Sequence, residues 1–181
     1  MSQIQLRQFG MVSLVSALVA FLAGCTNAGS LETPDPESEV TIGFVIDREN
    51  QKSTGFQICT TGSEVELVEV EPIEIIGEAE FLGAYLLDQG EAPIGSADGF
   101  PPEGYAEYLK PIGEAVVSFT CGDHPPGEFA QVVVGVDWSG NGGGQLNGFR
   151  VRYLTEGSTR SLEISNFHVE MCGANGEYCD D

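Results

Sequence analysis

The sequence predicts an all-β protein, an antiparallel β-sandwich of the immunoglobulin-like type with about eight strands. Two observations point to this class. Apolar and polar residues alternate over short segments, and Gly, Pro and Asp separate those segments. No stretch shows a helical period of useful length. The strand count favours the immunoglobulin-like arrangement over a jelly roll, and 181 residues suffice for one domain with a sizeable core.

The expected strands follow one another between residues 40 and 171. They occupy residues 40–46, 56–60, 65–70, 73–75, 81–87, 115–121, 131–138, 148–155 and 161–171. Within the third segment the apolar phase shifts by one residue at Val68, which predicts a β-bulge. Pro72 cannot donate a backbone hydrogen bond, so it predicts a sheet edge or a break before the next segment.

The first residues have the pattern of an export signal. Residues 1–10 are polar with Arg7 as their only charge, and residues 11–23 are apolar apart from two serines. This apolar run of about 13 residues is shorter than the roughly 20 that a spanning helix needs. The pattern therefore favours an export signal over a permanent transmembrane helix.

The four residues that end this segment, Leu22, Ala23, Gly24 and Cys25, resemble the lipobox of bacterial lipoproteins. In that family the cysteine thiol receives a diacylglycerol, and the chain is cut just before it. The resemblance implies that residues 1–24 are removed and that acylated Cys25 anchors the protein to the outer face of the cell membrane. An ordinary export signal with a chance cysteine is the alternative. We expect residues 25–39 to form a disordered acidic tether and residues 40–181 to form the sandwich domain.

The charge is strongly negative, with 28 acidic residues against 7 basic ones. Removal of Arg7 with the signal leaves 6 basic residues, so the mature chain has a net charge of 6 − 28 = −22. Such a field repels nucleic acid and favours cationic or neutral partners or divalent ions. A solvated acidic exterior without a specific partner explains the same composition.

Four cysteines remain besides Cys25, namely Cys59, Cys121, Cys172 and Cys179. An even number in an exported protein indicates two disulfides, for which three connectivities exist. We favour a Cys59–Cys121 bridge between strands and a short terminal Cys172–Cys179 loop. A zinc site is a poor alternative, because neither a C-x-x-C motif nor paired histidines are present.

A long segment without strand character, residues 88–112, is the candidate binding region. It holds Phe100, Tyr105 and Tyr108 among prolines and acids. Long loops in compact domains are usually functional or disordered, and aromatic residues on a stiff loop are common in binding surfaces. The alternative is a loop that folds back to cover the core.

The segment containing Asp137, Ser139 and Asn141 fits the first half of a calcium loop, because oxygen donors alternate before a glycine. The second half does not fit, since Gly148 occupies the position of the bidentate Glu. The alternative is a flexible hairpin connection at 141–144 whose glycines supply positive φ. Calcium is therefore the only cofactor that the sequence suggests, and the leading expectation is that no cofactor is bound.

The sequence gives little support to catalysis. The two histidines, His124 and His168, are expected to be structural, His168 in the apolar phase of its strand. The G-x-S-x-G motif is absent, because Ile94 occupies its first glycine position. Any pair chosen among 28 acids is uninformative. We expect no enzyme.

The pattern of Val132 to Val136, followed by a glycine-rich turn and the alternation from Gly148 to Tyr153, resembles uncharacterised exported bacterial β-domains. No function comes with that resemblance. The expected function is that of a lipid-anchored binding or structural module with a protein or cell-envelope partner. A calcium-dependent surface module and a hydrolase are the alternatives.

Replacement of the lipobox cysteine tests the anchor. Because stable anchoring takes more than one acyl chain, and the diacylglycerol on Cys25 is the expected source, Cys25→Ser should release the exported chain from membranes into the soluble fraction. Cell fractionation with immunoblotting measures this. A Cys25→Ser chain that stays wholly with the membranes would contradict the lipid anchor.

Overall fold

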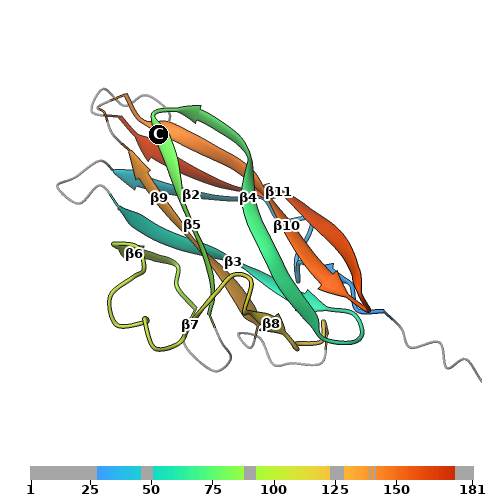
Figure 1. Ribbon diagram of the computed structural model, residues 1–181. Helices are drawn as coiled ribbons and strands as arrows, with labels where there is room; N and C mark the ends of the chain where they lie inside the picture. The colour runs from blue at the N-terminus through green and yellow to red at the C-terminus, as the bar shows by residue number, and fades with distance from the viewer. Residues whose placement is uncertain are drawn as a thin grey trace, which may run out of the picture.

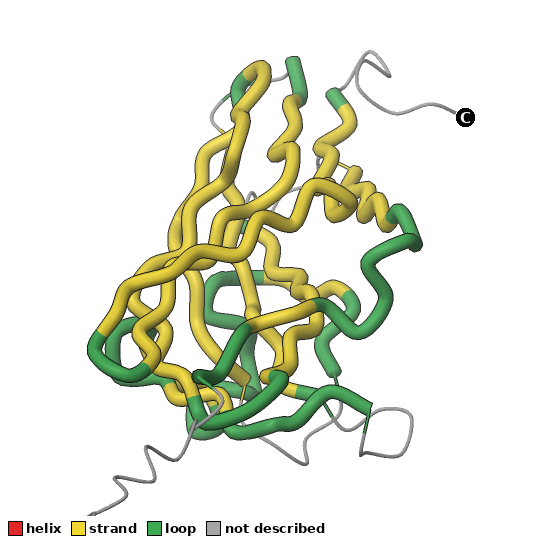
Figure 2. Tube along the Cα trace, turned by 90° about the vertical axis from the view of Figure 1, so that its right-hand side faces the viewer, coloured by secondary structure: helices red, strands yellow, loops and turns green. Residues whose placement is uncertain are grey.

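The computed structural model describes residues 28–45, 51–87, 93–122, 129–138, 140 and 142–173, and this part of the chain forms eleven strands and no helix (Figures 1 and 2). The all-β prediction is confirmed. The strands are β1 (Leu31–Glu32), β2 (Val40–Val45), β3 (Lys52–Thr60), β4 (Val65–Gly77), β5 (Ala79–Leu87), β6 (Ser96–Asp98), β7 (Leu109–Pro111), β8 (Val116–Val117), β9 (Ala130–Trp138), β10 (Gly144–Thr155) and β11 (Ser158–Cys172).

The strands form two sheets that pack around a shared core. One sheet has the order β1-β3-β9-β5-β7, with β6 also paired to β3, and the other has the order β2-β11-β10-β4-β8. One pairing between these strands, that of β2 with β11, is parallel. The expectation of purely antiparallel sheets is therefore wrong at this edge. Between β1 and β2 the chain crosses from one sheet to the other, and β2 then runs in the same direction as β11.

Aromatic side chains join the two sheets in the core. Phe56 on β3 has its ring centroid 5.4 Å from the ring of Phe149 on β10 and 5.4 Å from that of Phe167 on β11. All three side chains are at most 5% exposed. Full burial of a Phe side chain stabilises a fold by about 1.5–3 kcal/mol, so this contact contributes substantially to holding the sheets together.

The third predicted strand is confirmed together with its bulge. In the β4–β10 pairing, Glu69 lies opposite Arg152 and Leu67 lies opposite Tyr153, so that Val68 has no opposite residue. Of the two alternatives predicted at Pro72, the break is absent because β4 continues to Gly77, and the sheet edge is confirmed among the described residues. Pro72 can be accommodated there because β4 has β10 on one side, while β8 reaches only Val65 and Glu66 on the other.

The expected hairpin at 141–144 does not exist as such. β9 and β10 lie in different sheets, so the connection between them crosses from one layer to the other. The glycine requirement is nevertheless real, since Gly143 has φ +72° and a Cβ there would lie 2.4 Å from the carbonyl oxygen of Met171.

The folded domain begins earlier than residue 40. Leu31 is 2% exposed, and β1 pairs with the end of β3 through Leu31–Thr60 and Glu32–Cys59. Residues 28–39, expected in the tether, therefore include a strand of the domain. A buried leucine within an acidic, proline-rich segment accounts for the difference.

The predicted Cys59–Cys121 bridge is confirmed, and it ties β3 to the segment that follows β8. Cys172 is also disulfide-bonded, and its expected partner Cys179 lies outside the described residues. Cys25 and the expected signal segment lie outside them as well. Among the described residues, no helix has the length and hydropathy needed to cross a membrane.

Removal of the Cys59–Cys121 bridge should destabilise the domain. The double variant Cys59→Ala/Cys121→Ala frees the unfolded chain from a closed loop, which typically lowers the free energy of unfolding by about 2–5 kcal/mol. Urea unfolding followed by circular dichroism measures the change. A loss below about 0.5 kcal/mol, within the usual range of a neutral surface substitution, would contradict a stabilising role.

Candidate functional site

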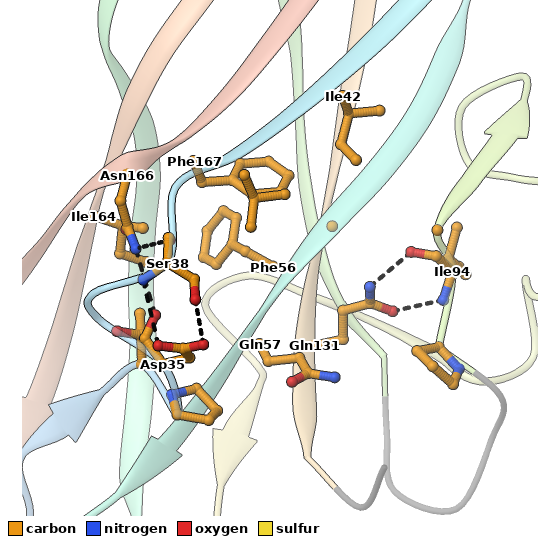
Figure 3. Close-up of a pocket in the computed structure, with 16 residues that line it drawn as sticks. Asp35, Ser38, Ile42, Phe56, Gln57, Ile94, Gln131, Ile164, Asn166 and Phe167 are labelled. Atoms are coloured by element: carbon orange, nitrogen blue, oxygen red, sulfur yellow. Dashed lines mark hydrogen bonds between the residues drawn. The ribbon is translucent and has the colours of Figure 1, made fainter. Parts of the chain in front are cut away.

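A cavity of about 350 Å³ lies at the edge of β3, flanked by β2 of the other sheet and by the segment before β6. Its wall is mainly apolar and includes Ile42, Phe56, Ile94, Ile164 and Phe167 (Figure 3). These side chains come from β2, β3, β11 and the segment before β6, four parts of the chain that are distant in sequence. Concave, largely apolar cavities with a few polar groups at the rim are the usual form of ligand sites.

A bulge in β11 places Phe167 in this wall. In the β10–β11 pairing, Asn147 lies opposite His168 and Phe149 lies opposite Ile164, so residues 165–167 together face Gly148 alone. Gly148 has φ +65°, and a Cβ there would lie 2.9 Å from the carbonyl oxygen of Ile164. Glycine is therefore required at the centre of this bulge.

The same bulge reverses the buried face of β11. Ile164 is buried before it, and Phe167, Val169 and Met171 are buried after it. His168 is consequently not in the apolar phase that its spacing from Ile164 predicts. Its side chain is 22% exposed and makes a 3.2 Å hydrogen bond between Nδ1 and Oδ1 of Asn147. A structural role fits this position, and His124 lies outside the described residues.

One amide side chain holds the segment between β1 and β2. Nδ2 of Asn166 donates to the carbonyl oxygen of Ser38 at 2.6 Å and lies 3.3 Å from that of Pro36 and 3.4 Å from that of Asp35. We call this set of contacts the Asn166 clamp (Figure 3). Because Asn166 belongs to the β11 bulge, the clamp fixes the β1–β2 connection to one side of the cavity.

A second amide holds the segment before β6 on the other side. Nε2 of Gln131 donates to the carbonyl oxygen of Ile94 at 2.7 Å, and its Oε1 accepts from the N–H of Ile94 at 2.8 Å. We call this pair the Gln131 clamp (Figure 3). Gln131 is 5% exposed, and its side chain lies against Gly55, where a Cβ would be 2.9 Å from Nε2 of Gln131. Gly55 therefore leaves the space that the clamp needs.

The rim of the cavity carries a negative charge. Asp35 lines the cavity and accepts a 2.5 Å hydrogen bond from the Ser38 hydroxyl, which lowers the pKa of Asp35 below its ordinary value of 3.8. A lowered pKa means that the interaction is present above pH 3.8 and is lost only as the pH falls through the lowered value. Asp35 is therefore ionised at neutral pH.

The arginines of β10 are engaged elsewhere. On the outer side of their sheet, Arg150 bridges Glu163 and Glu71 at 2.9 Å each, and Arg152 pairs with Glu69 at 2.7 Å. The hydrogen bonds to Glu163 and then to Glu71 raise the pKa of Arg150 above its usual range. These exposed cross-strand pairs neutralise the basic charge of this face locally.

The predicted binding aromatics pack against the first sheet. The ring of Phe100 lies 5.3 Å from that of Tyr85 on β5 and covers Gly135 on β9, where a Cβ would come within 2.2 Å of Cγ of Phe100. Tyr105 and Tyr108 are half-buried against a small cluster of Leu87, Ile94 and Val133. This arrangement is that of a covering segment, and none of the three aromatics lines the cavity.

The predicted calcium ligands lie largely outside the described residues, which include Asp137 but not Ser139 or Asn141. Oδ1 of Asp137 accepts from the N–H of Trp138 at 2.7 Å, and Oδ2 accepts from Gln51 at 3.3 Å. In the described ranges no group of three or more His, Cys, Asp or Glu side chains is arranged to hold a metal ion.

No family model matches this chain. No curated protein matches it either. Among solved structures, a family 123 glycoside hydrolase from Clostridium perfringens is similar with a TM-score of 0.39 and 10% identity, over 80% of this chain and 27% of that chain. The N-terminal domain of PorA is similar with a TM-score of 0.32 and 12% identity, over 79% of this chain and 95% of that chain. Likenesses at these TM-scores carry no functional argument.

The sequence interpretation missed the cavity, although part of its signal was readable. The shift of apolar phase between Ile164 and Phe167 indicates the bulge, as the shift at Val68 indicated the bulge in β4. The two clamps had no local signal, because Asn166 and Gln131 bind backbone groups that are distant in sequence.

Substitution of Gly135 tests whether Phe100 covers the sheet. Gly135→Ala places a Cβ against the Phe100 ring and should lower the free energy of unfolding by about 1–3 kcal/mol, because the ring must move. In a Phe100→Ala background the same substitution should cost much less, and Gly43→Ala, with open space around its Cβ, is the matched control. Equal losses at Gly135 in both backgrounds, measured by urea unfolding, would show that Phe100 does not pack there.

Proposed function

We propose that this chain is an exported, lipid-anchored and non-catalytic binding module whose ligand site is the cavity beside β3. The observation that carries the proposal is a preformed apolar cavity of about 350 Å³ with its two sides fixed by the Asn166 and Gln131 clamps. A cavity held open in this way loses little conformational entropy when a ligand enters. The two-sheet architecture supports an immunoglobulin-like module as the finer description of the proposed fold.

The chemistry of the wall defines the ligand. Phe56, Phe167 and Ile42 accept an apolar group, while ionised Asp35 and the net charge of −22 of the proposed mature chain disfavour an anion. An apolar group on a neutral or cationic partner, such as a protein or another cell-envelope component, satisfies both conditions.

Absence of catalysis is supported by how the polar rim is used. Among the described lining residues, the amides of Asn166 and Gln131 bind backbone groups and the carboxylate of Asp35 accepts from Ser38. These groups position chain segments, which supports a binding role for the site.

The proposed anchor places the module close to the membrane. Gly29, which is already buried in the domain, lies only four positions after Cys25. Four residues span at most about 14 Å. The domain therefore sits directly at the membrane surface, rather than at the end of the longer tether that the sequence predicts.

A neutral apolar dye such as N-phenyl-1-naphthylamine tests the site. The mature chain with Cys25→Ser, which removes the acyl group, should bind the dye with a rise in fluorescence. Gly95→Trp adds an indole to the cavity wall, at a position where a Cβ meets no other atom, and should weaken binding at least tenfold.

Ile75→Trp is the matched control, because Ile75 is 49% exposed on β4 and does not line the cavity. It should leave the affinity for the dye unchanged. The proposed site is wrong if the parent chain does not bind the dye, or if Gly95→Trp binds it as tightly as the parent does.

A further inference from the structure

The outer edge of β3 is interrupted beside the cavity. β6 pairs with Lys52, Ser53 and Thr54, and β1 pairs with Cys59 and Thr60 on the same side. Between them, residues 55–58 pair only with β9 on the inner side, as far as the described chain goes. The gap of four residues is about 13 Å long at the usual rise of a strand.

The backbone groups of Gln57 point toward this open side. At one end of β3 the carbonyl oxygen of Gln51 accepts from Gly99 beside β6, and at the other end the N–H of Thr61 donates to Ser30 beside β1. The pairing with β9 has no register shift from Lys52 to Ile58. Backbone groups alternate in direction along a strand, so the odd-numbered residues, including Gln57, face outward.

Each neighbouring segment is prevented from closing the gap. If β1 continued, Pro34 would lie opposite Gln57, but proline has no N–H to donate. If β6 continued, Pro93 would lie opposite Gln57, and this proline has no N–H to donate either. The interruption is therefore built into the fold on both sides.

We propose that an extended peptide segment of a partner protein adds to β3 at Gln57 as a short strand and places an apolar side chain in the cavity. This inference rests on the proposed function and names its ligand class. The N–H and C=O of Gln57 supply the main-chain hydrogen bonds of strand addition. Cross-strand neighbours share a face of the sheet, so the peptide residue opposite Phe56 points, like Phe56, into the space between the sheets.

The charge of the surroundings selects the flanks of the peptide. Asp35 is ionised on the rim, and Glu37 and Glu39 are exposed on the same connection. Lys or Arg residues next to the apolar anchor are attracted by these carboxylates, whereas acidic flanks are repelled.

Synthetic pentapeptides, whose three inner residues fit the gap of four residues, test the proposal on the mature chain with Cys25→Ser. Each has a lysine at both ends, threonine and valine within, and a central Phe, Leu, Val or Ala. Titration followed by amide NMR should shift the Gln57 signal, with Phe or Leu at the centre binding at least tenfold more tightly than Ala. Glutamate at both ends should weaken binding at least tenfold.

N-methylation of one peptide bond at a time provides the decisive comparison. In an added strand only every second N–H faces β3, so methylation should weaken binding at least tenfold at alternate positions and little at the positions between them. Gln57→Pro removes the outward N–H and should also weaken peptide binding, while Gln57→Ala keeps it. The methylation series needs no substitution at Gln57, so it remains decisive even if Gln57→Pro fails to fold.

The outcomes separate the two proposals. If the dye binds at the cavity but the peptides do not, or if N-methylation has the same effect at every position, strand addition is wrong and the site takes an isolated apolar group such as an acyl chain. If neither the dye nor the peptides bind, the proposed function fails as well.

Discussion

The contact of Phe56 with Phe149 and Phe167 is the interaction on which the rest of the structure depends. It joins β3 of one sheet to β10 and β11 of the other, with ring centroids 5.4 Å apart in both contacts from Phe56. The two rings that line the cavity, Phe56 and Phe167, belong to this cluster. Packing between the sheets and the shape of the candidate site therefore have the same physical origin.

The bulge in β11 connects that packing to the rim. It turns Phe167 into the core and leaves Asn166 beside it, able to hold the connection between β1 and β2. Gln131 does the same for the segment before β6. Gln131 is buried, and its clamp fixes the surrounding chain because leaving a buried amide unpaired costs about 1–3 kcal/mol. The cavity is consequently a rigid feature of the sandwich edge.

Much of the fold could be predicted from alternation alone, because long strands such as β4, β10 and β11 bury mainly one face, and the bulge at Val68 shifts that face visibly. Three features could not. The strand at Leu31 is two residues long, which is too short to show an alternation of apolar and polar residues. The parallel pairing of β2 with β11 depends on the path that the chain takes between the two sheets. The clamps depend on Asn166 and Gln131 meeting segments more than 30 residues away, which no local pattern encodes.

Amide hydrogen exchange at Gln57 tests the central claim most directly, namely that the edge of β3 is open beside the cavity. Exchange follows the opening of hydrogen bonds, so an unpaired amide exchanges far faster than its paired neighbours in the same strand. The structure predicts fast exchange at Gln57 and slow exchange at Phe56 and Ile58, resolved by NMR in the unliganded domain. Protection of Gln57 equal to that of Phe56 and Ile58 would contradict an open edge.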